Sequence, residues 1–389
     1  MKVEQIYQIL NTVTQEILGD SVVVAEDLSN IVDIGKAFSN LSGAVDNYVR
    51  RLPDHIGKVI DVNRVYRGRA PSVLRDGWEY GSILEKIRAN MPEATESENW
   101  QLQDGQSYDP NIFTAPDVSV KFFNDRVTFT VPMSISRKMV ESSFSNATQL
   151  NAFYSMIQTA IENSITVKMD ALVMRTINAA IGETFYADFP GGTYTGSSGV
   201  KAVNLLYLYN QRYGTSLSAA NAVTQPEFIR FASYVIKNYA ERMKSMSTLF
   251  NVGGTEKFTP TDRMHIVMLS EFANAADVFL YDGSGQFHDD RLRLPDAEVV
   301  PYWQGSGTDY AFTSTSKIYV TTPGNHAVEA SGILCCMFDH DSLGIANLDR
   351  QTTTQYNGVG DFWNEWHRYT AGHFLDLDEN FVVFYVASA

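Results

Sequence analysis

Residues 146–181 read NATQLNAFYSMIQTAIENSITVKMDALVMRTINAAI, a stretch of 36 residues without proline or glycine. Apolar residues recur through it at three- and four-residue spacing, which is the period of one face of an α-helix. Asn146 suits the N-cap, Gln149 stands at the capping-box position, and Gly182 follows as a C-terminal stop. We predict a single helix over 146–181, about 50 Å long at 1.5 Å per residue. The apolar spacing drifts from a strict heptad, which favours a helix lying across a sheet over a coiled coil.

Shorter helix and strand patterns follow this stretch. A second helix is predicted to begin near Thr224, with Pro226 in its first turn and Glu227 at the capping-box position, and another over 270–280. The closing sequence NFVVFYV, residues 380–386, is β-branched and aromatic, as sheet strands are. Other strands are predicted at 118–123, 127–132, 265–269, 299–300, 317–320 and 332–338.

The segments before the long helix do not form a core of their own. The first fifty residues carry short amphipathic helical patterns, which must pack against another part of this chain or against another chain. Residues 55–132 are interrupted repeatedly by glycine and proline, which argues against a compact helical core there.

Charge is distributed unevenly along the chain. Residues 50–88 have a net charge of +4, whereas the remainder carries −19 within a total of −15. A basic arm on an acidic body suits an arm that lies across a neighbouring copy of the same chain, although an ordinary solvated loop is the alternative. The candidate inter-subunit contacts in this arm are Arg64, Arg67, Arg69, Arg75, Trp78, Lys86 and Arg88.

Composition excludes several classes of protein. The strongly acidic balance disfavours a dedicated nucleic-acid reader, because such a chain repels phosphate. The only two cysteines, Cys335 and Cys336, are adjacent, which rules out a disulfide framework and a multi-cysteine zinc site. We expect two reduced thiols on opposite faces of one strand. We also expect a soluble protein made in a reducing cytoplasm, since no signal-peptide pattern or membrane-length apolar run is present.

Catalytic signatures are missing, so no catalytic, cofactor-binding or metal-ligating residue is predicted. The acidic groups at 339–341 and 376–379 are interpreted as polar, solvated turns, because adjacent residues rarely converge on one ion. Aromatic residues crowd the C-terminal third. Large aromatics are common in cores and in interfaces, so a core is the alternative, but the mixing with polar residues suits an interface better than a dry core: Tyr356, Phe362, Trp363, Trp366, Tyr369 and Phe374.

The order of these elements resembles the major capsid protein of tailed bacteriophages, which has the Hong Kong 97-type fold. The resemblance is carried by the strand 127–132 with 134–136, by 141–144 just before the long helix, and by the tail from 341–358 to 380–386. It extends over essentially the whole chain.

The resemblance implies an α+β fold and a shell protein. It implies an N-terminal arm at 1–54, an extended β-hairpin loop at 55–132, a peripheral domain at 133–199 and 340–389 that contains the spine helix, and an axial domain at 200–339. Copies would assemble as pentamers and hexamers into an icosahedral head shell around double-stranded DNA, without sequence-specific DNA binding, a cofactor or a membrane. Separate scaffolding, portal and decoration proteins would be its partners, and assembly would occur in the bacterial cytoplasm before the protein resides in the virion.

Two other classes of protein remain open. An encapsulin-like nanocompartment protein would share the fold, but it usually has a shorter loop than 55–132 and encloses a cargo enzyme. An α/β enzyme with an unrecognised site would form a small oligomer with a buried pocket rather than particles of megadalton mass.

Overall fold

The computed structural model describes residues 69–75, 84–89, 115–139, 147–279, 297–304 and 311–388, without the side chains of 147–156 and 277–279. It also describes a few isolated positions: Asn11, Gln15, Met91, Pro92, Ala94, Asp104 and Phe113. The predicted N-terminal arm, 1–54, therefore lies outside the described residues, apart from Asn11 and Gln15, which are helical. Helices and strands are mixed in the manner of an α+β fold, as predicted.

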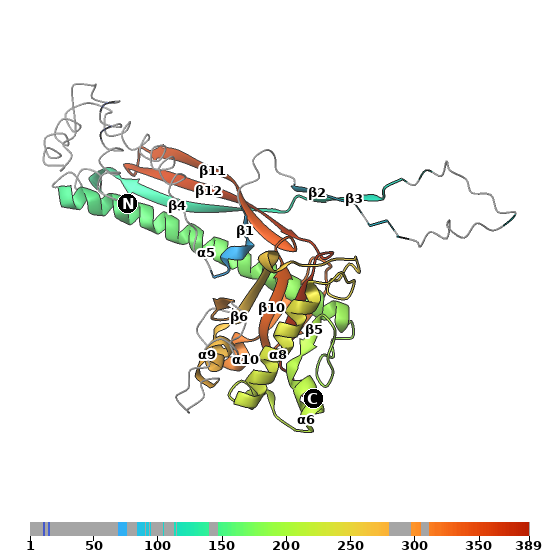
Figure 1. The fold of residues 1–389 in the computed structure, drawn as a ribbon. Coiled ribbons are helices and arrows are strands. Elements are labelled where there is room, and N and C mark those ends of the chain that lie inside the picture. Colours follow the sequence, from blue (N-terminus) through green and yellow to red (C-terminus); the bar gives the residue numbers. More distant parts are fainter. Residues whose placement is uncertain are drawn as a thin grey trace.

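The predicted long helix is present as α5, Ala147–Asp188, and has 42 residues. It lies across sheets rather than beside another helix of similar length (Figure 1). The prediction that Gly182 ends the helix is wrong, because α5 continues through it. A Cβ at this position would lie 2.8 Å from the side chains of both Val320 and Thr322. Gly182 therefore allows the hairpin of β8 (Ile318–Thr321) and β9 (Ala327–Ala330) to approach the helix closely. Its role is in packing, and it does not end the helix.

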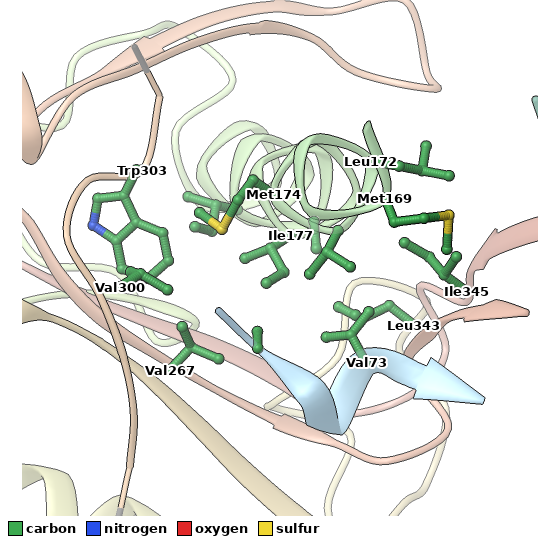
Figure 2. Packing of buried hydrophobic residues seen from close by; sticks show 14 of the residues in the cluster. Val73, Met169, Leu172, Met174, Ile177, Val267, Val300, Trp303, Leu343 and Ile345 are labelled. Atoms are coloured by element: carbon green, nitrogen blue, oxygen red, sulfur yellow. The ribbon is translucent and has the colours of Figure 1, made fainter. Parts of the chain in front are cut away.

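A four-stranded sheet covers the N-terminal part of α5 (Figure 1). Its strand order is β1 (Leu74–Arg75), β11 (Leu343–Asn357), β12 (Phe362–Leu375) and β4 (Arg126–Ser136). Only β1 pairs in parallel; the other neighbours are antiparallel. Apolar residues from α5, from the sheet and from the segment before β1 form one core, in which Val73 lies near Met169, Leu343 and Ile345 (Figure 2).

A second, five-stranded sheet lies toward the other end of α5. Its order is β5 (Ala202–Asn204), β13 (Phe381–Tyr385), β10 (Ile333–Asp339), β6 (Met264–Leu269) and β7 (Glu298–Val300). One face packs on the core shared with α5. The other is covered by α6 (Leu205–Tyr213), α8 (Pro226–Met243) and α9 (Ser270–Phe279).

The central strand β10 separates these two cores, since all seven of its residues are buried. Cys335 belongs to the core under the helices, and Cys336 belongs to the core under α5. The expectation of two thiols on opposite faces of a strand is therefore confirmed. Burial raises the pKa of both thiols, which removes them from consideration as nucleophiles at neutral pH.

The last strand lies in a different sheet from its nearest neighbour in sequence. β12 lies between β11 and β4 in the four-stranded sheet, whereas β13 lies between β5 and β10 in the five-stranded sheet. Because β13 pairs with β5 and β10, residues 381–385 belong to the same sheet as strands of the predicted axial domain, 200–339. They do not share a sheet with β11 and β12 of the predicted peripheral domain. The remaining elements are η1 (Pro71–Val73), α7 (Ala219–Ala222), η3 (Thr261–Arg263), α10 (Phe312–Thr315), β8 (Ile318–Thr321) and β9 (Ala327–Ala330).

The aromatic residues of the C-terminal third divide between core and surface. Trp363, Tyr369 and Phe374 are buried, so for these three the prediction of an interface is wrong. Trp363 and Tyr369 lie on the face of β12 that meets the core, where period-two alternation hides every second side chain. Phe374 lies on the opposite face and packs against Phe123. The other three, Tyr356, Phe362 and Trp366, are half-buried.

Strands β2 (Leu84–Ala89) and β3 (Val118–Phe123) form a separate antiparallel hairpin. Figure 1 shows it projecting away from both larger sheets. This arrangement matches the predicted two-stranded loop in the range 55–132. Within the part of the chain described here, no helix is long and apolar enough to cross a membrane.

Candidate functional site: the base of the extended hairpin

The β2–β3 hairpin has two chemically different faces. Leu84, Lys86 and Arg88 of β2 are half-buried, whereas the residues between them are exposed. Lys86 is paired in register with Lys121 of β3, so these side chains share the inward face. Successive side chains of a strand point to opposite faces. Lys86, Arg88 and Lys121 therefore point toward the body of the molecule, and the residues between them point away from it.

The inward face lies over the turn 376–379, which connects β12 to β13. Lys86 Nζ lies 2.7 Å from Asp376 Oδ2 and 2.7 Å from Glu379 Oε1. Arg88 donates to Asp378 Oδ2 at 3.1 Å and to Glu379 Oε1 at 3.2 Å. The hairpin is thus joined to the body by hydrogen-bonded ion pairs from two successive inward positions of β2.

Two further lysines complete this cluster. Lys121 Nζ of β3 lies 3.0 Å from Asp376 Oδ1 and 2.5 Å from Asp378 Oδ2. Lys257, which belongs to the body, lies 2.9 Å from Glu379 Oε1. Beside the charged cluster, the rings of Phe123 and Phe374 pack with their centroids 5.5 Å apart. Four cations and three carboxylates, together with this apolar contact, form what we call the hairpin anchor.

Asp376 and Glu379 of the anchor have lowered pKa values although both are buried. Burial by itself would raise the pKa of Asp376, but the hydrogen bonds and charges of Lys86 and Lys121 outweigh it, and the pKa lies below its ordinary value. The pKa of Glu379 is lowered in the same way against burial, by Lys86 and Lys257. In return, Asp378 and Asp376 raise the pKa of Lys121 in spite of its partial desolvation.

The prediction of a solvated turn at 376–379 is half right. The segment is a turn, but the side chain of Asp376 is 0% exposed and that of Glu379 is nearly covered. Its acids are neutralised by cations that lie more than a hundred residues away in sequence, which no local pattern could indicate. The prediction of a polar turn at 339–341 is confirmed for His340 and Asp341, whereas Asp339 is the last residue of β10 and is buried.

The chemistry of the anchor is that of a structural contact, which holds the hairpin against the body of the molecule. Each of the three carboxylates is already paired with ammonium or guanidinium groups of this chain. Across the described ranges, no group of three histidine, cysteine, aspartate or glutamate residues is placed to hold a metal ion.

The other predicted contact residues also meet their own chain where they are described. Arg69 forms an ion pair with Asp170 of α5, and its guanidinium lies 4.7 Å from the ring centroid of Tyr302. Arg75 contacts His340 and donates to the carbonyl oxygen of Leu343 at 3.1 Å. Three predicted contacts lie outside the described residues: Arg64, Arg67 and Trp78.

Sequence reasoning missed several members of the anchor. Lys121 and Phe123 were visible only as part of a strand pattern at 118–123, where their spacing of two places them on one face. The acidic run at 376–379 directly precedes the strongly apolar run 380–386, which is the one sequence signal of its burial. Lys257 has no sequence signal that distinguishes it from other surface lysines.

The outward face of the hairpin is exposed and apolar except for Glu85, which is paired with Phe122. Ile87 is 66% exposed and Phe122 is 65% exposed, and Val118 and Val120 are exposed beside them. Ile87 is paired directly with Val120, so these side chains form one continuous strip along the two strands. No described residue of this chain covers the strip.

Comparison of the sequence with models of protein families shows to which family the chain belongs. The sequence matches the model of the Phi29-like phage major capsid protein family over residues 10–385. The chain belongs to this family. This capsid protein is thus a building block of the phage head shell, it assembles with other copies of itself, and its place is the virion capsid. The helix, hairpin and two sheets are the elements of the Hong Kong 97-type fold that the resemblance implied.

Solved capsid structures show likeness to this capsid protein at low sequence identity. The capsid of Staphylococcus phage Andhra has 11% identity and a TM-score of 0.47, with 84% of this chain and 86% of that chain covered. The capsid of cyanophage P-SCSP1u has 12% identity and a TM-score of 0.44, with 84% and 91% covered. The capsid of an empty GTA particle has 13% identity and a TM-score of 0.39, with 86% and 98% covered. No curated protein matches the sequence.

Proposed function

We propose that copies of this capsid protein form an icosahedral shell of pentamers and hexamers, in which the β2–β3 hairpin of each copy lies over a neighbouring copy. The observation that carries the proposal is the division of the hairpin into two faces. One face is tied to its own body by the anchor, and the opposite face presents Ile87, Val120 and Phe122 to solvent. An exposed apolar strip of this kind is typical of a surface that a partner covers.

The basic arm contributes to this arrangement in two ways. Arg69, Arg75, Lys86 and Arg88 act within the chain, where they fix the position from which the loop leaves the body. We propose Arg64, Arg67 and Trp78 as direct contacts with the neighbouring copy, which is acidic overall. The same net charge of −15 suits a shell that encloses double-stranded DNA without binding its sequence.

We further propose a division of the body into two functional domains. The peripheral domain contains α5, β11, β12 and the whole of β4, so by strand pairing it begins at 126 rather than 133 and extends over 126–199 and 340–375. The axial domain contains 200–339 and, by its strand pairing, β13. The protein would have no catalytic role, would assemble in the bacterial cytoplasm, and would use separate scaffolding, portal and decoration proteins.

Particle formation tests the shell. The full chain is expressed in bacteria, run on a sizing column with light scattering, and the same peak is viewed by negative-stain microscopy. Uniform icosahedral particles are expected. A chain that stays a monomer or dimer even with its scaffolding protein supplied would overturn the proposal. DNA inside particles produced with the packaging machinery would separate a phage head from an encapsulin, which would enclose a cargo enzyme instead.

Substitutions on the outward face test the role of the hairpin. Ile87→Ser combined with Phe122→Ser removes the apolar strip without touching the anchor, so we expect a folded subunit that assembles poorly. Val167→Ser is the matched control, because Val167 is equally exposed at 66% but lies on α5. Normal particle yield from the double variant would exclude the strip as a contact between copies.

A further inference from the structure

A groove lies between helices α6 and α8, on the side of the five-stranded sheet away from α5. Its volume is about 520 Å³, and both helices line it. Phe231 and Val235 provide an apolar floor, and polar side chains stand along its walls: Gln211, Arg212, Tyr234, Asn238 and Arg242. It is distinct from the hairpin anchor, which is built from β2, β3, Lys257 and the turn 376–379.

Aromatic rings hold both arginines of the groove in place. The guanidinium of Arg212 lies 5.6 Å from the ring centroid of Tyr234, 5.9 Å from that of Tyr213 and 6.0 Å from that of Phe231. The guanidinium of Arg242 lies 5.6 Å from the ring centroid of Tyr239. A guanidinium stacked on rings keeps its N–H edge free to form two parallel hydrogen bonds to a carboxylate.

Neither arginine has a carboxylate partner among the residues that the structure describes. Other cations near α8 do have one: Arg230 is paired with Glu227 at 3.3 Å, and Lys244 with Glu241 at 2.7 Å. The two arginines that face the groove thus lack the local acidic partner that Arg230 and Lys244 have. This is an arrangement that a negatively charged partner would complete.

The groove is rich in tyrosine and arginine, as the central parts of protein–protein interfaces are. Tyrosine and arginine are the residues most enriched at energetically important interface positions, and Tyr234 is 52% exposed here. Asn238 and Arg212 hydrogen-bond to the Tyr234 hydroxyl and lower its pKa, which uses one of the five N–H donors of Arg212 and leaves the others available. An exposed, preorganised set of donors on an apolar floor needs an acidic and partly apolar ligand.

We propose that the α6–α8 groove binds an acidic segment of a second copy of this chain. The chain has 45 acidic and 30 basic residues, so its surface supplies the complementary charge. Copies of the chain are also the partner that head-shell assembly brings to every such groove. The inference rests on the proposed shell and assigns one of its contacts to named residues of the axial domain.

Site-specific cross-linking tests who occupies the groove. Tyr234 is replaced by the photoreactive p-benzoylphenylalanine in the full chain, and purified particles are irradiated. We expect a band at twice the chain mass that contains peptides of this chain only, joined to an acidic segment. Cross-links to nucleic acid or to another protein, or no intermolecular cross-link in intact particles, would overturn the inference.

Charge reversal tests the contribution of the groove to assembly. Arg212→Glu with Arg242→Glu is compared with Arg230→Glu with Lys244→Glu, which makes the same change in net charge outside the groove. We expect the groove variant to lose about tenfold or more in particle yield and the control to stay close to the parent. Circular dichroism and the Tm of each subunit show whether the variant folds. If the charge-reversal variant does not fold, Arg212→Lys with Arg242→Lys provides a milder substitution.

The outcomes separate this inference from the proposed shell. Particles from the parent and equal yields from both reversed pairs would contradict the groove contact and leave the shell intact. A parent chain that forms no particles with its scaffolding protein would contradict the shell itself.

Discussion

The Nζ of Lys86 lies 2.7 Å from Oδ2 of Asp376, although the two residues are 290 positions apart in the chain. Lys86 is in the projecting hairpin, and Asp376 is in the turn where the chain passes from the first sheet to the second. One ion pair therefore joins the hairpin to the boundary between the two sheets. Any movement of the hairpin base relative to the body must break it.

Removing the charge of Asp376 should destabilise the subunit. Asp376→Asn keeps the shape and the bond from the amide of Asp378, but leaves Lys86 and Lys121 without their shared carboxylate. We expect a loss of about 2 kcal/mol in the free energy of unfolding, since hydrogen bonds to a buried carboxylate are lost while Lys86 keeps Glu379 and Lys121 keeps Asp378. Urea denaturation of the unassembled subunit measures it.

Asp341→Asn is the matched control for this substitution. Asp341 also pairs with an arginine, Arg263, but both side chains are nearly half exposed. Exposed pairs contribute little, so we expect a loss of less than about 1 kcal/mol. Equal losses for the two variants would show that burial of the anchor is not what makes it stabilising.

The anchor should weaken in acid. The folded-state pKa values of Asp376 and Glu379 are lowered, so their contribution to stability is fully present above the ordinary carboxyl pKa of about 4. It is lost as the pH falls through the lower folded-state values, because protonation ends the ion pairs. Hydrogen exchange of β2 amides between pH 6 and pH 3, corrected for intrinsic exchange, should show protection falling at the acid end. Lys86→Met should flatten this dependence; an unchanged profile would contradict the assignment.

Gly182→Ala should destabilise the protein although alanine favours helices. The new methyl group would lie 2.8 Å from side-chain carbons of Val320 and Thr322, and such overpacking costs about 1–3 kcal/mol. The gain in helix propensity is at most about 1 kcal/mol. Thermal unfolding should therefore give a lower Tm. Gly191→Ala, where no atom lies within 4 Å of the new Cβ, should leave the Tm nearly unchanged.

Both cysteines should resist thiol reagents in the folded subunit. Cys335 and Cys336 have no exposed surface, and burial raises the pKa of each thiol. We expect no alkylation by iodoacetamide at pH 8 and complete alkylation of both in denaturant, read by mass spectrometry. Rapid labelling of the native subunit would mean that β10 opens far more readily than a central strand should.

Local patterns in the sequence predicted many of the helices and strands, but not the two longest strands, β11 and β12, whose sequences are rich in polar residues. The apolar period and the missing breakers predicted α5, and Pro226 and Glu227 predicted the start of α8, because helix periodicity and capping are properties of neighbouring residues. The strands β4, β6, β10 and β13 followed from β-branched and apolar runs. Breakers and excess positive charge also marked the loop region, from which the hairpin projects.

Tertiary structure alone decided where these elements meet. Gly182 is a stop signal in sequence and a close-packing position in the fold, because Val320 approaches it from 138 residues away. The run at 376–379 looks like a solvated turn until Lys86, Arg88 and Lys121 lie over it. The placement of β13 in the second sheet depends on its pairing with β5 and β10. Such contacts join residues far apart in the chain, and a single sequence records the residue types but not which of them come together.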